Sequence, residues 1–339
     1  MPDGPSALRV ALVFPDLLGT YGDSGNAVIL AQRLRWRDQP AEIVEIHAGA
    51  AVPDSCDLYV VGGGEDQPQA LAAAELNRQR SLHRAVERGA AVLAVCAGLQ
   101  ILGTTFVGPD GLEQPGLGLL DCTTVRGRGR RAVGELVVEP AGAVSASAAA
   151  GLPLMAGLPL MTGYENHGGV TVLGPDAEPF GFVRSGVGNG SAATTGSAAT
   201  SAATTGGTPT GGAQAGGITR HLRRYTALNV ARSAAERVVP GARVVDTAPP
   251  TDGAVNGRVW GTYMHGPVLA RNPALADAIL SLVTGPLPPL DDTEAEVLRE
   301  ERLRRAPGEA SPGSSGYAGS HRARPGRWDP RRVLTRSRR

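Results

Sequence analysis

The sequence predicts an α/β fold in which helices flank a mostly parallel β-sheet. Short apolar runs rich in Val, Leu and Ile recur along the chain, and polar or glycine-rich loops follow several of them. Segments with apolar residues at helical spacing lie between these runs. Because strands that alternate with helices form βαβ units, ligands are expected beyond the carboxyl ends of the strands. The expected strands are 8–14, 42–47, 58–61, 92–95, 136–139 and 258–263, and the expected helices are 27–37, 68–89, 273–283 and 293–305.

The composition argues against several classes of protein. The net charge of +1 creates no field that would draw the chain to nucleic acid. All 33 basic residues are Arg, which excludes a Schiff-base lysine and the lysine of a phosphate-binding P-loop. The three cysteines form neither a disulfide framework nor a Cys-x-x-Cys metal pair. The sequence has no signal-peptide pattern and no apolar run near the ~20 residues that span a bilayer, so we expect a cytoplasmic protein.

The predicted organisation is one domain over residues 1–305 with one interruption. A Gly/Ala/Ser/Thr tract that contains SAATTG twice lacks the apolar residues of a core, so a flexible insertion is expected at about 188–252. Residues 306–339 are rich in Pro, Gly, Ser and Arg, and are expected to form a disordered basic tail.

The stretch AAVLAVCAGLQILG, residues 90–103, predicts a sharp strand-to-helix turn at Cys96. A side chain in such a turn projects from the carboxyl edge of the sheet, at the helix end where backbone N–H groups have no partner. This environment favours the reactive thiolate, and the same amides can stabilise an oxyanion. The pattern Cys-x-Gly-x-Gln is similar to the nucleophile elbow of class I glutamine amidotransferases. The alternative is a buried structural cysteine.

Two further segments end predicted strands. The glycines at 62–64 follow the strand 58–61, and the amide of Gly63 or Gly64 is a candidate oxyanion donor opposite Cys96, with a simple tight turn as the alternative. His265 ends the strand 258–263 and is a candidate base, although a turn histidine is the alternative interpretation.

An arginine cluster lies at residues 126–131. Arg126, Arg128 and Arg130 are expected on a solvated face. Arg131 directly precedes a predicted strand, so it is a candidate for holding a substrate carboxylate in a bidentate fork. The segment GYENHGG, residues 163–169, is dense in polar, turn-forming residues and on its own is typical of a loop with a satisfied histidine.

Five stretches in order carry a family resemblance: YGDSGN, GGGEDQPQAL, VCAGLQILG, GYENHGG and GTYMHGPVLARNP. Together they resemble the cobyric-acid-synthase type of class I glutamine amidotransferase, and in particular the small glutaminase subunits of lipid II isoglutaminyl synthases. The resemblance implies that Cys96 and His265 catalyse and that Arg131 binds glutamine, with Arg130 one position away as the alternative. The further expected substrate-binding residues are Gly63, Gly64, Ala97 and Gln100.

The sequence departs from the wider class in one place. Many class I enzymes carry His-x-Glu, in which the glutamate orients the histidine, but here Pro267 stands in that position. A third catalytic residue must therefore come from another segment. Asp23 is the first choice because its loop lies at the carboxyl end of a predicted strand, and Glu165 is the second.

The resemblance also implies a reaction and a partner. Glutamine would be hydrolysed to glutamate and ammonia without a metal or organic cofactor. The ammonia would pass to a Mur-ligase-like synthetase in a heterodimer, which would use ATP to amidate the α-carboxyl of D-glutamate in the lipid II stem peptide. One alternative is the glutaminase part of a split cobyric-acid-type enzyme that amidates a corrinoid. Another is a non-catalytic scaffold on the same fold.

Overall fold

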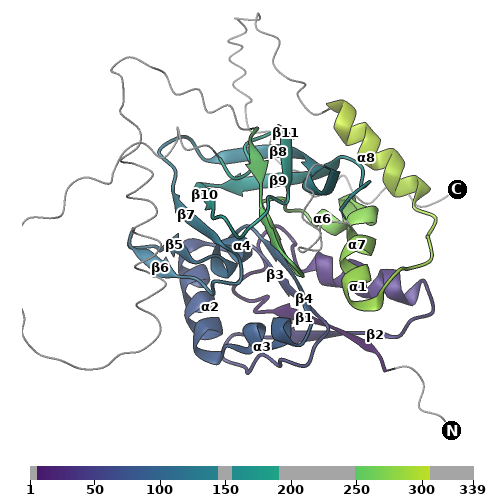
Figure 1. Ribbon diagram of the computed structural model, residues 1–339, viewed down its shortest axis with the longest axis horizontal. Helices are drawn as coiled ribbons and strands as arrows, with labels where there is room; N and C mark the ends of the chain where they lie inside the picture. The colour runs from purple at the N-terminus through teal and green to yellow at the C-terminus, as the bar shows by residue number, and fades with distance from the viewer. Residues whose placement is uncertain (1–5, 144–154, 191–248, 306–339) are drawn as a thin grey trace, which may run out of the picture. The chain divides into compact units, whose positions relative to one another are not determined.

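The computed structural model describes residues 6–143, 155–190 and 249–305. Its centre is a six-stranded sheet in which five strands run parallel and the edge strand β13 runs antiparallel (Figure 1). The strands in spatial order are β13 (Ala254–Asn256), β14 (Val259–Thr262), β4 (Ala91–Val95), β3 (Leu58–Val61), β1 (Leu8–Val13) and β2 (Ala41–Ile46). Every residue of β3, β4 and β14 is buried, as expected for apolar strands covered on both faces.

Helices cover both faces of this sheet. Helices α1 and α7 pack against each other on one face, and α2, α3 and α4 lie on the other (Figure 1). The helices are α1 (Gly25–Arg35), α2 (Asp66–Gln79), α3 (Ser81–Glu87), α4 (Ala97–Leu102), α6 (Val268–Arg271), α7 (Pro273–Thr284) and α8 (Thr293–Arg305), with a 3₁₀ turn at Ala141–Ala143. The predicted fold class, an α/β protein with a mostly parallel sheet between helices, is confirmed.

Two smaller sheets, which the sequence analysis did not predict as sheets, adjoin the carboxyl ends of the parallel strands (Figure 1). Both are mainly antiparallel. One contains β5 (Thr105–Val107), β6 (Glu113–Pro115), β7 (Cys122–Arg126) and β10 (Gly169–Leu173). The other contains β8 (Ala132–Pro140), β9 (Met161–His167), β11 (Gly181–Ser185) and β12 (Thr251–Asp252).

Two local expectations were wrong. The single helix expected at 68–89 is two helices, because Arg80 adopts a left-handed conformation with φ of 53° and ends the first of them. The segment 163–169 is not a plain loop, because its residues up to His167 form most of β9 and pair with β8 in full register. Side chains alternate between the two faces of that strand, which suits a polar segment that borders a cavity on one side.

The approximate limits of the expected insertion, 188 and 252, fall within packed residues. Asn189 is buried, and its backbone N–H donates to the Thr251 carbonyl at 2.8 Å. Asp252 is fully buried in β12. The insertion proper, residues 191–248, and the expected basic tail, residues 306–339, lie outside the described residues.

The contact between Asn189 and Thr251 predicts that the insertion can be shortened. Because the residues on either side of 191–248 lie next to each other, a short Gly-Ser linker in place of this segment should change the free energy of unfolding by less than about 1 kcal/mol. Thermal unfolding followed by circular dichroism measures this change. Insoluble protein, or a melting temperature far below that of the parent chain, would show that the segment contributes to the core.

Candidate active site

Neighbouring parallel strands deliver four residues to one point at the edge of the central sheet. Cys96 follows β4, and His265 lies shortly after the adjacent strand β14. Gly63 follows β3 on the other side of β4, and Asp23 lies in the loop between β1 and α1. The order of the strands, rather than proximity in sequence, therefore brings these residues together.

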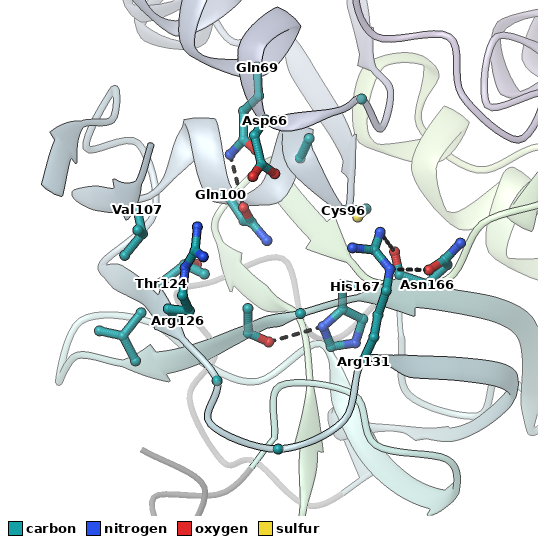
Figure 2. A pocket seen from close by; sticks show the side chains of 17 residues that line it. Asp66, Gln69, Cys96, Gln100, Val107, Thr124, Arg126, Arg131, Asn166 and His167 are labelled. Atoms are coloured by element: carbon teal, nitrogen blue, oxygen red, sulfur yellow. Dashed lines mark hydrogen bonds between the residues drawn. The ribbon is translucent and has the colours of Figure 1, made fainter. Parts of the chain in front are cut away.

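Cys96 occupies a strained turn. Its backbone has φ of 52° and ψ of −105°, which a residue with a side chain rarely adopts, and it is 7% exposed. Gly98 makes this turn possible, since a Cβ there would lie 2.4 Å from the carbonyl oxygen of Val61. The sharp turn holds the sulfur at the wall of a cavity, as expected for a nucleophile elbow, and the cavity lining includes Cys96 itself (Figure 2).

His265 and Asp23 form a buried pair. The Nδ1 atom of His265 lies 2.8 Å from Oδ2 of Asp23, and both side chains are almost fully buried. The other ring nitrogen, Nε2, has no hydrogen-bond partner among the described residues and is the nitrogen left to serve Cys96. Burial alone would lower the pKa of His265, but its hydrogen bond to the Asp23 carboxylate and its interaction with Cys96 raise that pKa to about 10.

Gly63 supports this pair rather than an oxyanion. Its backbone N–H donates to Oδ2 of Asp23 at 2.9 Å, so the expectation that this amide serves the oxyanion was wrong. A Cβ on Gly63 would lie 2.5 Å from Cε1 of His265, which explains the glycine at this position. Gly64 lines the cavity beside Cys96 and Ala97, and its amide remains the candidate donor.

The cavity beside Cys96 has a volume of about 320 Å³. It is lined by residues that follow two parallel strands, β3 and β4, and by strands of both small sheets (Figure 2). Its polar side chains come from Asp66, Gln69, Cys96, Gln100, Thr124, Arg126, Arg131, Asn166 and His167.

Arg131 reaches this cavity, as the sequence analysis expected. Its Nε donates to the side-chain oxygen of Asn166, and its Nη2 donates to the backbone carbonyl of the same residue at 2.9 Å. Arg130 is exposed and does not line the cavity. Arg126 is exposed, as expected of a solvated arginine, but it also lines the cavity, which the sequence analysis did not foresee (Figure 2). It is the last residue of β7, the strand that borders the cavity.

Gln100 lies on the cavity wall one turn after Cys96. Its side-chain oxygen accepts a hydrogen bond from Gln69 at 2.9 Å, and its side-chain nitrogen donates to the Tyr263 hydroxyl at 3.2 Å (Figure 2 shows the first). The amide is thereby oriented from two sides.

Glu165, the second choice for a third catalytic residue, belongs to a different network. It accepts hydrogen bonds from the backbone N–H groups of Val187 and Gly188 and lies 3.4 Å from Nε2 of His167. Among the residues that the structure describes, no hydrogen bond joins Glu165 to His265. His167 in turn stacks on Tyr263 with ring centroids 3.8 Å apart.

Sequence reasoning missed several residues of the site. Asn166 anchors Arg131 and also donates to the hydroxyl of Tyr21. The Tyr21 ring lies edge-on to His265, with centroids 5.0 Å apart, and its own φ of 60° is unusual for a tyrosine. The dense polar pattern of YGDSGN and GYENHGG was the available signal, but neither pattern says that the two segments meet.

The raised pKa of His265 gives a direct prediction. A histidine whose pKa is about 10 instead of 6.5 keeps its proton throughout the neutral range and loses it only as the pH rises through 10. NMR titration of histidine-labelled protein should therefore show the His265 signal still protonated at pH 8, and His265→Gln should remove that signal. Asp23→Asn should move the titration to lower pH. A His265 signal that titrates near 6.5 would contradict the geometry.

Two negative findings apply to the described residues. Within residues 6–143, 155–190 and 249–305, no group of three or more His, Cys, Asp or Glu side chains is arranged to hold a metal ion. No helix in the same part of the chain is long and apolar enough to cross a membrane.

Comparisons with known proteins agree with this site. Over 176 residues the chain is 37% identical to the lipid II isoglutaminyl synthase (glutamine-hydrolyzing) subunit GatD of Staphylococcus aureus, which covers 51% of this chain and 65% of that protein. It is 29% identical over 189 residues to the corresponding subunit of Streptococcus pneumoniae, covering 55% of this chain and 66% of the relative. A probable cobyric acid synthase of Methanoregula boonei is 35% identical over 130 residues, which are 37% of this chain and 25% of that protein.

The chain thus spans just under two-thirds of the length of the first two relatives. Residues 9–209, more than half of the chain, match the CobB/CobQ-like glutamine amidotransferase domain. This range contains Asp23, Cys96 and Arg131, while His265 lies beyond it. The chain belongs to the CobB/CobQ-like glutamine amidotransferase family.

Proposed function

We propose that this chain hydrolyses glutamine to glutamate and ammonia, with Cys96 as nucleophile, His265 as acid and base, and Asp23 as the third member. The observation that carries the proposal is the buried pair of His265 and Asp23, 2.8 Å apart, at the edge of the sheet where Cys96 enters the cavity. A nucleophile, a base and a group that orients the base are the parts that covalent amide hydrolysis requires.

The reaction would proceed in two steps. The Cys96 thiolate attacks the side-chain carbonyl of glutamine, and the amides of Ala97 and Gly64 hold the resulting oxyanion. His265 carries the thiol proton and donates it from Nε2 to the departing nitrogen, so that ammonia leaves and a γ-glutamyl thioester remains. Water then attacks the thioester, with His265 accepting a proton, and glutamate is released. No step requires a metal or an organic cofactor.

Arg131 would bind the α-carboxylate of glutamine, because Asn166 already fixes the orientation of its guanidinium. Arg131→Ala should weaken glutamine binding by on the order of 1.5–3 kcal/mol, seen as a raised KM. Arg128→Ala is the matched control, since Arg128 belongs to the same cluster but does not line the cavity. Equal increases of KM in both variants would mean that the cluster acts through its overall charge.

The ammonia would go to a partner subunit that activates an acceptor. The similar proteins of Staphylococcus aureus and Streptococcus pneumoniae are each named as a subunit of a lipid II isoglutaminyl synthase. We therefore propose a cytoplasmic heterodimer with a Mur-ligase-like synthetase that uses ATP to amidate the α-carboxyl of D-glutamate in lipid II. Direct transfer within a complex keeps ammonia from becoming protonated in water, where it would lose its nucleophilicity.

The similarity to a cobyric acid synthase favours a second candidate, amidation of a corrinoid. One experiment separates the two. The chain is purified with its synthetase, and the pair is supplied with ATP, glutamine and either lipid II or a corrinoid carboxylate. Amidated lipid II supports the first proposal, and an amidated corrinoid alone replaces it. A pair that assembles but releases no glutamate from glutamine would favour the scaffold alternative.

A further inference from the structure

Charged side chains are unevenly distributed in the cavity beside Cys96. Apart from His167, three residues that line the cavity have charged side chains: Asp66, Arg126 and Arg131. Asp66 is the single acid among the lining residues of this cavity. Figure 2 shows its carboxylate next to the Gln100 side chain, while Arg131 lies on the side of Asn166.

The backbone fixes Asp66 at this wall. It is the first residue of α2, directly after the loop that carries Gly63 and Gly64. One turn later in the same helix, Gln69 is 4% exposed and donates to Gln100. Since Gln69 and Gln100 tie α2 to α4 under the cavity, the start of α2 cannot move away from the site without breaking this contact.

Asp66 has no hydrogen-bond or ion-pair partner among the residues that the structure describes. The side-chain nitrogen of Gln100 donates to Tyr263, and Arg131 is held by Asn166. Asp66 is therefore an exposed carboxylate without a protein partner, at the wall of a cavity that also presents arginines. Such a set fits a ligand with both a negative and a positive group.

We propose that Asp66 binds the α-ammonium of glutamine and so makes the site specific for an amino acid rather than for any primary amide. This inference rests on the proposed function, in which Arg131 takes the α-carboxylate. The α-carboxylate and the α-ammonium of glutamine are bonded to the same carbon atom. A cavity whose wall has both a cationic and an anionic side chain can therefore bind both groups at once. A side-chain amide without the α-ammonium would meet an unpaired Asp66 and bind more weakly.

The test compares two ligands and two substitutions. Isothermal titration calorimetry on the full-length Cys96→Ser chain, which cannot turn the ligands over, gives the Kd of L-glutamine and of glutaramate, the same molecule without its α-ammonium. Adding Asp66→Asn should weaken glutamine binding by roughly 10-fold or more and leave glutaramate binding nearly unchanged. Glu65→Gln is the matched control because Glu65 is the neighbouring acid, is exposed like Asp66 and does not line the cavity.

Each outcome decides one point. A selective loss of glutamine affinity in Asp66→Asn, with Glu65→Gln unchanged, supports the assignment. Unchanged glutamine affinity, or an equal loss for both ligands, overturns it, because a merely structural role would not distinguish the ligands. Absence of glutamine binding to the Cys96→Ser chain itself would count against the proposed function, whereas the other outcomes concern Asp66 alone.

Discussion

Replacing Cys96 with serine is expected to abolish glutamine hydrolysis, with kcat lower by on the order of 10⁴-fold or more, as when other nucleophiles of this type are removed. The serine hydroxyl is a poor nucleophile without the thiolate, while its size and the strained backbone are kept. Glutamate release in a coupled dehydrogenase assay measures the effect. In the assembled pair, amidation driven by a high ammonium concentration should survive, because the synthetase reaction occurs elsewhere.

The other two cysteines provide the control. Burial raises the pKa of Cys122 to about 12 and also raises the pKa of Cys56, so both remain neutral thiols at physiological pH. Cys56→Ala and Cys122→Ala should therefore keep wild-type turnover in protein that remains folded. Normal glutamate release by Cys96→Ser would end the assignment of the nucleophile. Failure of the variant pair with ammonium, despite assembly, would contradict the division of labour between the subunits.

Asp23→Asn is expected to lower kcat by on the order of 10²–10⁴-fold, because the carboxylate both orients His265 and stabilises its imidazolium. The neutral amide of Asn cannot offset the positive charge of the imidazolium next to it. Steady-state kinetics with glutamine measure the change. It should affect kcat much more than KM, since Asp23 is buried behind the histidine and does not line the cavity.

Asp16→Asn is a matched control for this substitution. Asp16 lies near a histidine too, with 3.7 Å between its Oδ1 and Nδ1 of His47, but both side chains are largely exposed. A near-normal kcat is expected for Asp16→Asn, because an ion pair that is exposed to solvent contributes little free energy. If Asp23→Asn and Asp16→Asn are equally active, His265 is oriented by some other group.

Local sequence patterns were sufficient to predict the strands of the parallel sheet. Buried strands such as Leu58–Val61 and Ala91–Val95 are continuous apolar runs, and such runs need no partner to be recognised. The sharp turn at Cys96 could also be predicted from residues close to it in sequence, namely Gly98 and the apolar residues on either side. The choice of Asp23 over Glu165 rested only on the position of its loop at the end of a strand. In the structure, Asp23 is hydrogen-bonded to His265.

The errors came from tertiary contacts. Whether the Gly63 amide faces a substrate or a carboxylate depends on Asp23, 40 residues away in sequence. That the exposed Arg126 also lines the cavity depends on the pairing of β7 with β10, which aligns the end of β7 with the cavity. The strand over Met161–His167 looks like a loop because its stability comes from pairing with β8 rather than from its own residues.

The central claim, that Cys96 is the nucleophile of a glutamine-hydrolysing site, is tested most directly by labelling with 6-diazo-5-oxo-L-norleucine, an electrophilic analogue of glutamine. Cleavage after arginine leaves Cys96 and Cys122 together in the peptide 89–126, so fragment-ion sequencing must locate the label. One adduct per chain, on Cys96 and prevented by excess glutamine, is the predicted result. An adduct on Cys122 or Cys56, or an unlabelled Cys96 in protein that releases glutamate from glutamine, would contradict the account.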